Sequence, residues 1–194
     1  MEGANALHAM AGAAIAAARE ASLHHLTDAM RPLRDRIEAV CALDVLVAQS
    51  IAAAPVTFRG RTFEIEEGGA PAILIVARDE FGAIEDLAAF APDAPYRHAL
   101  MFGRGTALGF GAFHDRRFHE HLRLAMHASV WSYLSAQGRG LLPLNWRFIA
   151  LELIERRIEG VVATNVAEGR EIERRLARAL KPPSLYIQQR EEAA

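Results

Sequence analysis

The spacing of apolar residues changes twice along this chain, and those changes limit the folds it can adopt. In the first fifty residues the spacing is that of a helix, as in the run Leu33, Ile37, Val40, Leu43, Val47 and Ile51. Pro32 predicts a break between two helices, because proline has no amide hydrogen with which to continue one, and Pro55 ends the region. We therefore expect a helical N-terminal extension over residues 1–54.

After Pro55 the pattern becomes that of strands. The segment VTFRGRTFEIEEGG (56–69) predicts a hairpin that turns near Gly60, and PAILIVARDEFGAIEDLAAFAP (71–92) predicts a second hairpin. The second turn is expected at Asp79–Gly82, where the aspartate can accept backbone hydrogen bonds and the glycine can adopt a positive φ. RHALMFG (97–103) adds a further strand, so this region predicts an antiparallel meander.

The C-terminal half alternates short strands with helices. We expect strands at HLRLAM (121–126), LLPL (141–144) and VVAT (161–164), with a helix after each of them. Asn145 and Asn165 are expected to cap the last two helices. Strands alternating with helices are typical of a parallel sheet. The sequence thus predicts an α/β fold, with a βαβ-type, mostly parallel sheet in a domain over residues 55–194. Antiparallel hairpins lead into this sheet, and the helical extension precedes it.

Composition excludes several classes of protein. Hydrophobic residues make up 52% of the chain and charged residues 24%, which is typical of a soluble globular protein. No apolar run is long enough to span a membrane, and no basic segment precedes the N-terminal apolar stretch, so neither a membrane protein nor a signal peptide is expected. The single cysteine, Cys41, excludes an intrachain disulfide and a cysteine zinc cage. We expect a cytoplasmic protein.

Positive charge is concentrated in one segment. The formal net charge is −2, yet residues 97–147 carry seven Arg or Lys against two Asp or Glu. A basic patch of this kind can attract phosphates or acidic partners, although a solvated arginine face is the plainer explanation. The candidates for contact with nucleic-acid phosphates are Arg116, Arg117, Arg123, Arg139 and Arg147.

Four of the eight histidines fall in HDRRFHEHLRLAMH (114–127), inside the basic segment. On a strand His119 and His121 would share one face, as metal ligands must, and His114 could supply a third ligand. On a helix the pair would diverge by about 200°. The intervening arginines raise the electrostatic cost of binding a dication. A divalent-metal site, a basic surface and a polar loop are the three interpretations of this segment.

The segment VVATNVAEGREIERRLARAL (161–180) resembles the strand, loop and helix of Toprim domains in phage and mobile-element primases. In that family the strand ends in an acidic D-x-D, followed by a short loop with a glycine and a long charged helix. Gly169 and Arg170 stand where the family's glycine and basic residue stand. LRLAMHASVWSYLSAQGRGLLPLN (122–145) resembles the strand and helix that carry the family's glutamate, and ILIVARDEFGAIEDLAAF (73–90) its leading hairpin. The resemblance covers roughly residues 72–189.

This resemblance implies a degenerate Toprim-like domain that lacks its metal-binding carboxylates. Toprim chemistry needs carboxylates at the carboxyl ends of neighbouring strands, where they hold magnesium against a nucleotide phosphate. Here the D-x-D positions hold Thr164 and Val166, and the glutamate position falls among Ala125, Met126 and His127. The residues expected to mark the vestigial strand-end site are His127, Thr164, Asn165, Glu168 and Arg170.

Three functions remain open. The first is a non-catalytic, cofactor-free accessory protein of phage or mobile-element type that binds nucleic acid or a replication or defence partner. The second is a phosphoesterase or nucleotidyl-transfer enzyme that uses a divalent metal held by His114, His119 and His121. The third is a protein-interaction module whose N-terminal helices dock onto a partner or form a homodimer. Salt-dependent nucleic-acid binding, bound metal, or a dimer that disappears on truncation of residues 1–50 would distinguish them.

Overall fold

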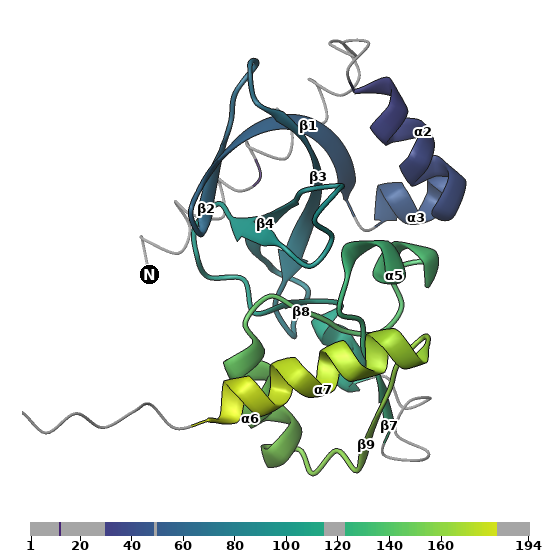
Figure 1. Cartoon of the computed structure of the whole chain (residues 1–194), viewed down its shortest axis with the longest axis vertical. Coiled ribbons are helices and arrows are strands. Elements are labelled where there is room, and N and C mark those ends of the chain that lie inside the picture. The colour runs from purple at the N-terminus through teal and green to yellow at the C-terminus, as the bar shows by residue number, and fades with distance from the viewer. Residues whose placement is uncertain (1–11, 13–29, 49, 115–122, 182–194) are drawn as a thin grey trace, which may run out of the picture.

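A computed structural model of the chain describes residue 12 and residues 30–48, 50–114 and 123–181. These residues form two lobes, which Figure 1 shows one above the other. The upper lobe holds helices α2 (Arg31–Val40) and α3 (Leu43–Ala48) and the larger sheet, and the lower lobe holds the later helices and short strands. Within these ranges no helix combines the length and apolar character needed to cross a membrane.

Five antiparallel strands make the sheet of the upper lobe. Their order across the sheet is β2 (Thr62–Ile65), β1 (Ile51–Arg59), β3 (Ala70–Arg78), β4 (Ile84–Phe90) and β5 (His98–Leu100). The sheet is curled, because the amide of Leu100 at one edge donates a hydrogen bond of 2.9 Å to the carbonyl of Arg61 beside the other. The predicted turn between β3 and β4 is confirmed: Asp79 accepts from the amides of Phe81 and Ala83, and Gly82 has a φ of 80°.

The buried run of β3 is explained by the two cores that it separates. Ile73, Ile75 and Ala77 face a core shared with Leu33 and Ile37 of α2. The alternating residues Ala72, Leu74 and Val76 face the inside of the curled sheet, where Phe63 and Leu87 pack against them. A strand covered on both faces is apolar at nearly every position, which accounts for the sequence AILIVA.

The lower lobe is built from short strands and three helices. In chain order its elements are β6 (Ala107–Leu108), the 3-10 helix η1 (Phe110–His114), β7 (Arg123–Ala125), α5 (Val130–Ser135), β8 (Leu142–Pro143), α6 (Trp146–Glu155), β9 (Gly160–Val162) and α7 (Val166–Leu180). Leu124, Met126, Leu141, Ile149 and Ile172 share its core. α5 packs against α2, so this helix joins the lower lobe to the upper one.

The described part of the chain does not show the predicted mostly parallel sheet, whereas the antiparallel meander expected before it is the sheet of the upper lobe. Among the described residues the largest sheet is antiparallel, and parallel pairing is limited to β7 with β9 and to a single bridge between Met126 and Leu141. The segment LLPL contributes only Leu141 to this pairing, because Leu142 and Pro143 pair with β6 in the antiparallel sense. Apolar periodicity predicted where the strands lie, but it did not specify their partners.

The N-terminal region differs from the prediction at its end. Ile51 to Ala54 belong to β1 and pair with β3, so Pro55 lies inside a strand, opposite Pro71, and does not close a helical region. Cross-strand pairing outweighs the helical spacing that reaches Ile51, because these residues pack against the sheet. The division of the chain into domains at residue 54 stays a prediction, and most of residues 1–29 lie outside the described part.

Candidate functional site

The strand-end site is formed where β7 and β9 end side by side. Because these strands are parallel, with Ala125 opposite Val162, the residues that follow them lie at the same edge. His127 follows β7, whereas Thr164 and Asn165 follow β9. The Asn165 side chain accepts from the amide of Glu168, which is the predicted helix cap and which places Glu168 in the first turn of α7. A hydrogen bond then joins the segments that follow the two strands, because the amide of Ala128, after β7, donates to Glu168 Oε1 at 2.9 Å.

His127 is held in one orientation by the loop that follows α5. Its side chain is 4% exposed, and Nε2 donates to the carbonyl of Arg139 at 2.9 Å. Gly140 makes room for the ring: its φ is +90°, and a Cβ at that position would lie 3.1 Å from His127 Nε2 and 2.8 Å from the carbonyl oxygen of Ala125. The other ring nitrogen, Nδ1, is buried and has no hydrogen-bond partner among the described residues.

The buried carboxylate of Glu168 lies opposite that nitrogen. Its Oε1 is 3.9 Å from His127 Nδ1, and Glu168 is itself 4% exposed. Burial alone would raise the pKa of Glu168, but the neighbouring Ser132 hydroxyl, the Ala128 amide, the Thr164 hydroxyl and His127 outweigh it and lower the pKa. The side chain is therefore an ionised carboxylate at neutral pH, with Oε1 bonded to the Ala128 amide and Oε2 buried without a hydrogen-bond partner among the described residues.

The structure thus brings four of the five predicted strand-end residues together. Arg170 is the exception, because it lies further along α7 and no hydrogen bond or ion pair links it to the other four among the described residues. Metal ligation by the histidine segment stays a prediction: His119 and His121 lie outside the described residues, as does the side chain of His114. In the part of the chain that is described, no group of three His, Cys, Asp or Glu side chains could hold a metal ion.

The predicted phosphate contacts do not gather at one point. Arg123 begins β7, at the end opposite His127, Arg139 belongs to the loop before β8, and Arg147 lies in the first turn of α6. All three side chains are exposed. Arg116 and Arg117 lie outside the described residues.

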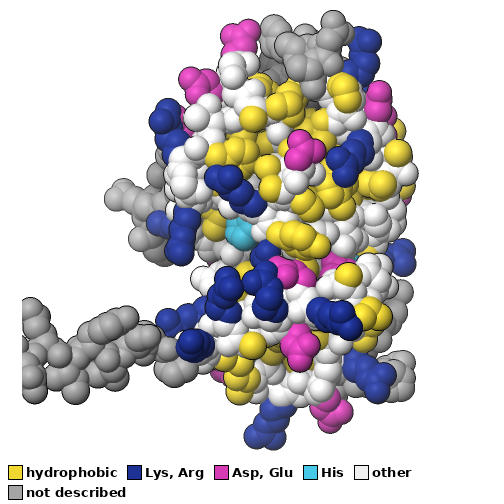
Figure 2. Space-filling model, in the orientation of Figure 1, with side chains coloured by type: hydrophobic (Ala, Val, Ile, Leu, Met, Phe, Trp, Pro, Cys, Tyr) yellow, Lys and Arg dark blue, Asp and Glu magenta, His cyan; other side chains and the backbone are white. Residues whose placement is uncertain are grey.

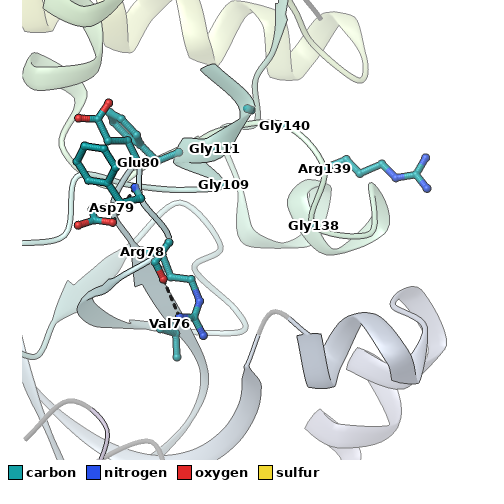
Figure 3. Close-up of a pocket in the computed structure, with 13 residues that line it drawn as sticks. Val76, Arg78, Asp79, Glu80, Gly109, Gly111, Gly138, Arg139 and Gly140 are labelled. Carbon is teal, nitrogen blue, oxygen red and sulfur yellow. Dashed lines mark hydrogen bonds between the residues drawn. The ribbon is translucent and has the colours of Figure 1, made fainter. Parts of the chain in front are cut away.

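A cleft of about 820 Å³ lies between the lobes, next to the strand-end site. One wall is the tip of the β3–β4 hairpin and the other is the loop Gly138–Gly140 with the start of η1 (Figure 3). The backbones of Gly109 and Gly140 touch, and a Cβ on Gly109 would lie 2.1 Å from the carbonyl oxygen of Gly140. Phe81 stands at the hairpin tip with 87% of its surface exposed, whereas the Arg139 side chain extends away from the hairpin.

The hairpin tip is tied to the lower lobe by an arginine from the end of α6. Arg156 lies 3.5 Å from a carboxylate oxygen of Glu80, and its guanidinium is stacked 5.0 Å from the ring centroid of Phe113. Sequence reasoning did not find this cleft. The signal was present in the four glycines that line its far wall, but glycines far apart in sequence do not reveal that they meet in space.

Sequence reasoning also missed Asp86, which organises the link between the lobes. This residue is fully buried in β4 and accepts from the amides of Leu87, Phe102, Arg104 and Gly105, at 2.7–3.0 Å. The loop from β5 to β6 therefore wraps around a single carboxylate. A carboxylate inside an apolar strand was the available signal, because such a group must find donors when it is buried.

Comparison with solved structures relates this fold to primases. The structure of the DnaG catalytic core matches with a TM-score of 0.54 and 14% sequence identity, over 87% of this chain and 65% of that one. The zinc-binding and RNA polymerase domains of the Aquifex aeolicus primase match with a TM-score of 0.52 and 10% identity, over 77% of this chain and 47% of that one. The chain therefore shares its fold with these primase structures and spans only part of their length.

No protein-family model and no curated protein matches this sequence.

Proposed function

We propose that this chain is a non-catalytic, nucleic-acid-binding protein built on a primase-related fold. The observation that carries the proposal is the pair of His127 and Glu168 at the strand ends. Metal-assisted phosphoryl transfer needs carboxylate oxygens that face a bound ion at this edge. Here Glu168 Oε1 accepts from the Ala128 amide and His127 Nε2 donates to a backbone carbonyl, so neither atom faces an open ion site, and the remaining atoms, Glu168 Oε2 and His127 Nδ1, are buried.

Binding of nucleic acid is supported by the fold and by exposed cations, of which Arg139 lines the cleft. Arg139 and Arg147 are exposed and make no ion pair with the described residues, so both are available to phosphate oxygens. Phe81 adds an exposed aromatic ring at the cleft rim, where an unpaired base can stack. Arg116, Arg117 and Arg123 extend the same basic segment in sequence.

The biological setting that we propose follows from the resemblance to phage and mobile-element primase domains. The chain would act as an accessory protein in replication or defence, in the cytoplasm, with nucleic acid as its ligand and no cofactor of its own. A protein partner, or a homodimer through the N-terminal helices, is compatible with this role.

Fluorescence anisotropy with labelled single- and double-stranded DNA and RNA tests the proposal. We expect binding that weakens as salt increases, because phosphate contacts release counterions. The variants Arg139→Ala, Arg147→Ala and Arg116→Ala/Arg117→Ala should each bind less tightly, and Phe81→Ala should lose affinity for single strands. Arg31→Ala/Arg34→Ala on α2 removes two charges far from the cleft and serves as the matched control.

Two results would contradict the proposal. Absence of binding to every probe at low salt would remove nucleic acid as the ligand. Stoichiometric divalent metal in the purified protein, together with metal-dependent hydrolysis of a phosphodiester, would favour the enzyme that uses His114, His119 and His121.

A further inference from the structure

The outer face of α7 carries a row of cations. Arg170, Arg174 and Arg178 follow one another at four-residue spacing, so they share one side of the helix at intervals of roughly 6 Å. Lys181 continues the row directly after the helix. All four residues are exposed, and Figure 2 shows Lys and Arg side chains gathered along the position of α7.

Neighbouring carboxylates do not neutralise this row. Glu171 contacts both Arg174 and Arg175 and is only 17% exposed, so its charge is shared between two guanidinium groups. Within the described ranges Arg170, Arg178 and Lys181 form no ion pair. The helix dipole accounts for cations in the last turn, but Arg170 lies near the amino end, where the dipole gives a cation no advantage.

Aromatic side chains lie beside the row. Arg175 places its guanidinium 5.5 Å from the ring centroid of Tyr96 and 5.2 Å from that of Trp146. This contact holds Tyr96 against α7 although 47% of its surface remains exposed. The next residue, Arg97, is exposed and extends the positive charge to the upper lobe, where it stacks over Phe58.

We propose that this face, made of Arg170, Arg174, Arg178 and Lys181 with Tyr96 and Arg97, is the surface along which a single-stranded nucleic acid lies. The repeated cations match the repeated phosphates of an extended backbone, and an exposed aromatic ring offers a base a surface on which to stack. This inference rests on the proposed function, but it assigns phosphate-binding residues on α7 that are not part of the strand-end pair His127 and Glu168 and do not belong to the sequence segment 114–127.

The test is anisotropy with a labelled single-stranded oligonucleotide and its duplex, at several salt concentrations. In Arg174→Ala/Arg178→Ala we expect affinity for the single strand to fall about ten-fold at low salt. The plot of log K against log salt has a negative slope, and this slope should become shallower by about 0.7 for each phosphate that is no longer neutralised. The matched control is Arg31→Ala/Arg34→Ala, which removes the same charge and includes Arg34, paired with Glu38 on its own helix as Arg174 is paired with Glu171. The control should bind like the unmodified chain.

Substitutions of Tyr96 test whether the surface prefers single strands or attracts any nucleic acid by charge alone. Tyr96→Leu should lower affinity for the single strand more than for the duplex, whereas Tyr96→Phe should retain both affinities because the ring is kept. Equal losses on the two probes, or none, would overturn the assignment to single strands.

The outcomes also separate the two proposals. If the unmodified chain binds nucleic acid and the α7 variant binds equally well with an unchanged salt slope, the α7 surface is refuted while the proposed function stands. If the unmodified chain binds no probe, both are refuted. Thermal unfolding of each variant shows that weaker binding does not reflect a failure to fold.

Discussion

At the scale of single residues, the strand-end site depends on which way one carboxylate faces. Glu168 lies in the first turn of α7, three residues after Asn165, where a glutamate often bonds back to the amide of the capping residue. The structure instead buries it against His127 and the Ala128 amide. Asn165 performs the capping, so Glu168 is left to fill the place where β7 and β9 end.

The pKa of Glu168 gives this site a pH signature. Since the folded-state pKa lies below the ordinary value of 4.5, the carboxylate contributes stability above pH 4.5 that is lost as the pH falls through the folded-state pKa. We expect Glu168→Gln to lower the free energy of unfolding by roughly 1 kcal/mol at pH 7 and to flatten the loss of stability in acid. Urea unfolding at pH 7 and across the acid range measures both effects. Glu173→Gln, at an exposed position of the same helix, is the control, and identical acid profiles for the two variants would contradict this account.

At the scale of elements, one side chain defines the connection between β5 and β6. Asp86 is bonded to three backbone amides of that connection, Phe102, Arg104 and Gly105, as well as to its own neighbour. Side chains elsewhere in the loop are therefore less important to its shape than this carboxylate, which lies in a strand sixteen or more residues earlier in the chain.

Removing that acceptor should destabilise the whole fold. Asp86→Ala leaves buried amides without a partner, so we expect the free energy of unfolding to fall by about 3 kcal/mol or more. Asp86→Asn keeps one carbonyl oxygen and should cost less. Urea unfolding of both variants, beside Asp93→Asn at an exposed position, provides the measurement. A loss for Asp86→Ala no larger than that of the control would show that the loop is held by other interactions.

At this scale the sequence predicted features set by neighbouring residues better than features set by residues far apart. Local signals succeeded: Asp79 and Gly82 form the expected turn, and Asn145 and Asn165 cap the expected helices. The meeting of His127 with Glu168 was also expected, from the resemblance to Toprim domains, but two other features that depend on residues distant in sequence were not predicted, because periodicity does not specify partners. These are the antiparallel pairing of β8 with β6 and the loop around Asp86.

At the scale of the whole molecule, a small set of polar contacts joins the two lobes. His98 of β5 donates from Nε2 to the carbonyl of Leu144 at 3.0 Å, and Trp131 of α5 donates to the carbonyl of Pro92. Arg175 donates a hydrogen bond to the carbonyl of Tyr96, and Arg156 forms an ion pair with Glu80. These contacts add to the apolar core that the two lobes share, and one of them involves a group that can change its protonation state.

His98 is that group. Burial lowers the pKa of His98 and the nearby Arg175 lowers it further, while the hydrogen bond to Leu144 partly opposes both. The folded protein therefore favours the neutral ring, and stability that is present above the ordinary value of 6.5 is lost as the pH falls toward the folded-state pKa. We expect the melting temperature to decrease below pH 6.5, and to decrease less in His98→Gln, which keeps a donor for Leu144 but does not titrate. Parallel pH profiles for the two proteins would contradict this assignment.

The contact between Gly109 and Gly140 limits which substitutions this protein can accept at the cleft. Neither position tolerates even a methyl group, so that part of the cleft surface is main chain and no substitution can place a side chain on it. Any ligand that touches it meets peptide groups whose chemistry does not change with the sequence. Two proteins of this kind could therefore differ at most of their side chains and still present the same patch of cleft to what they bind.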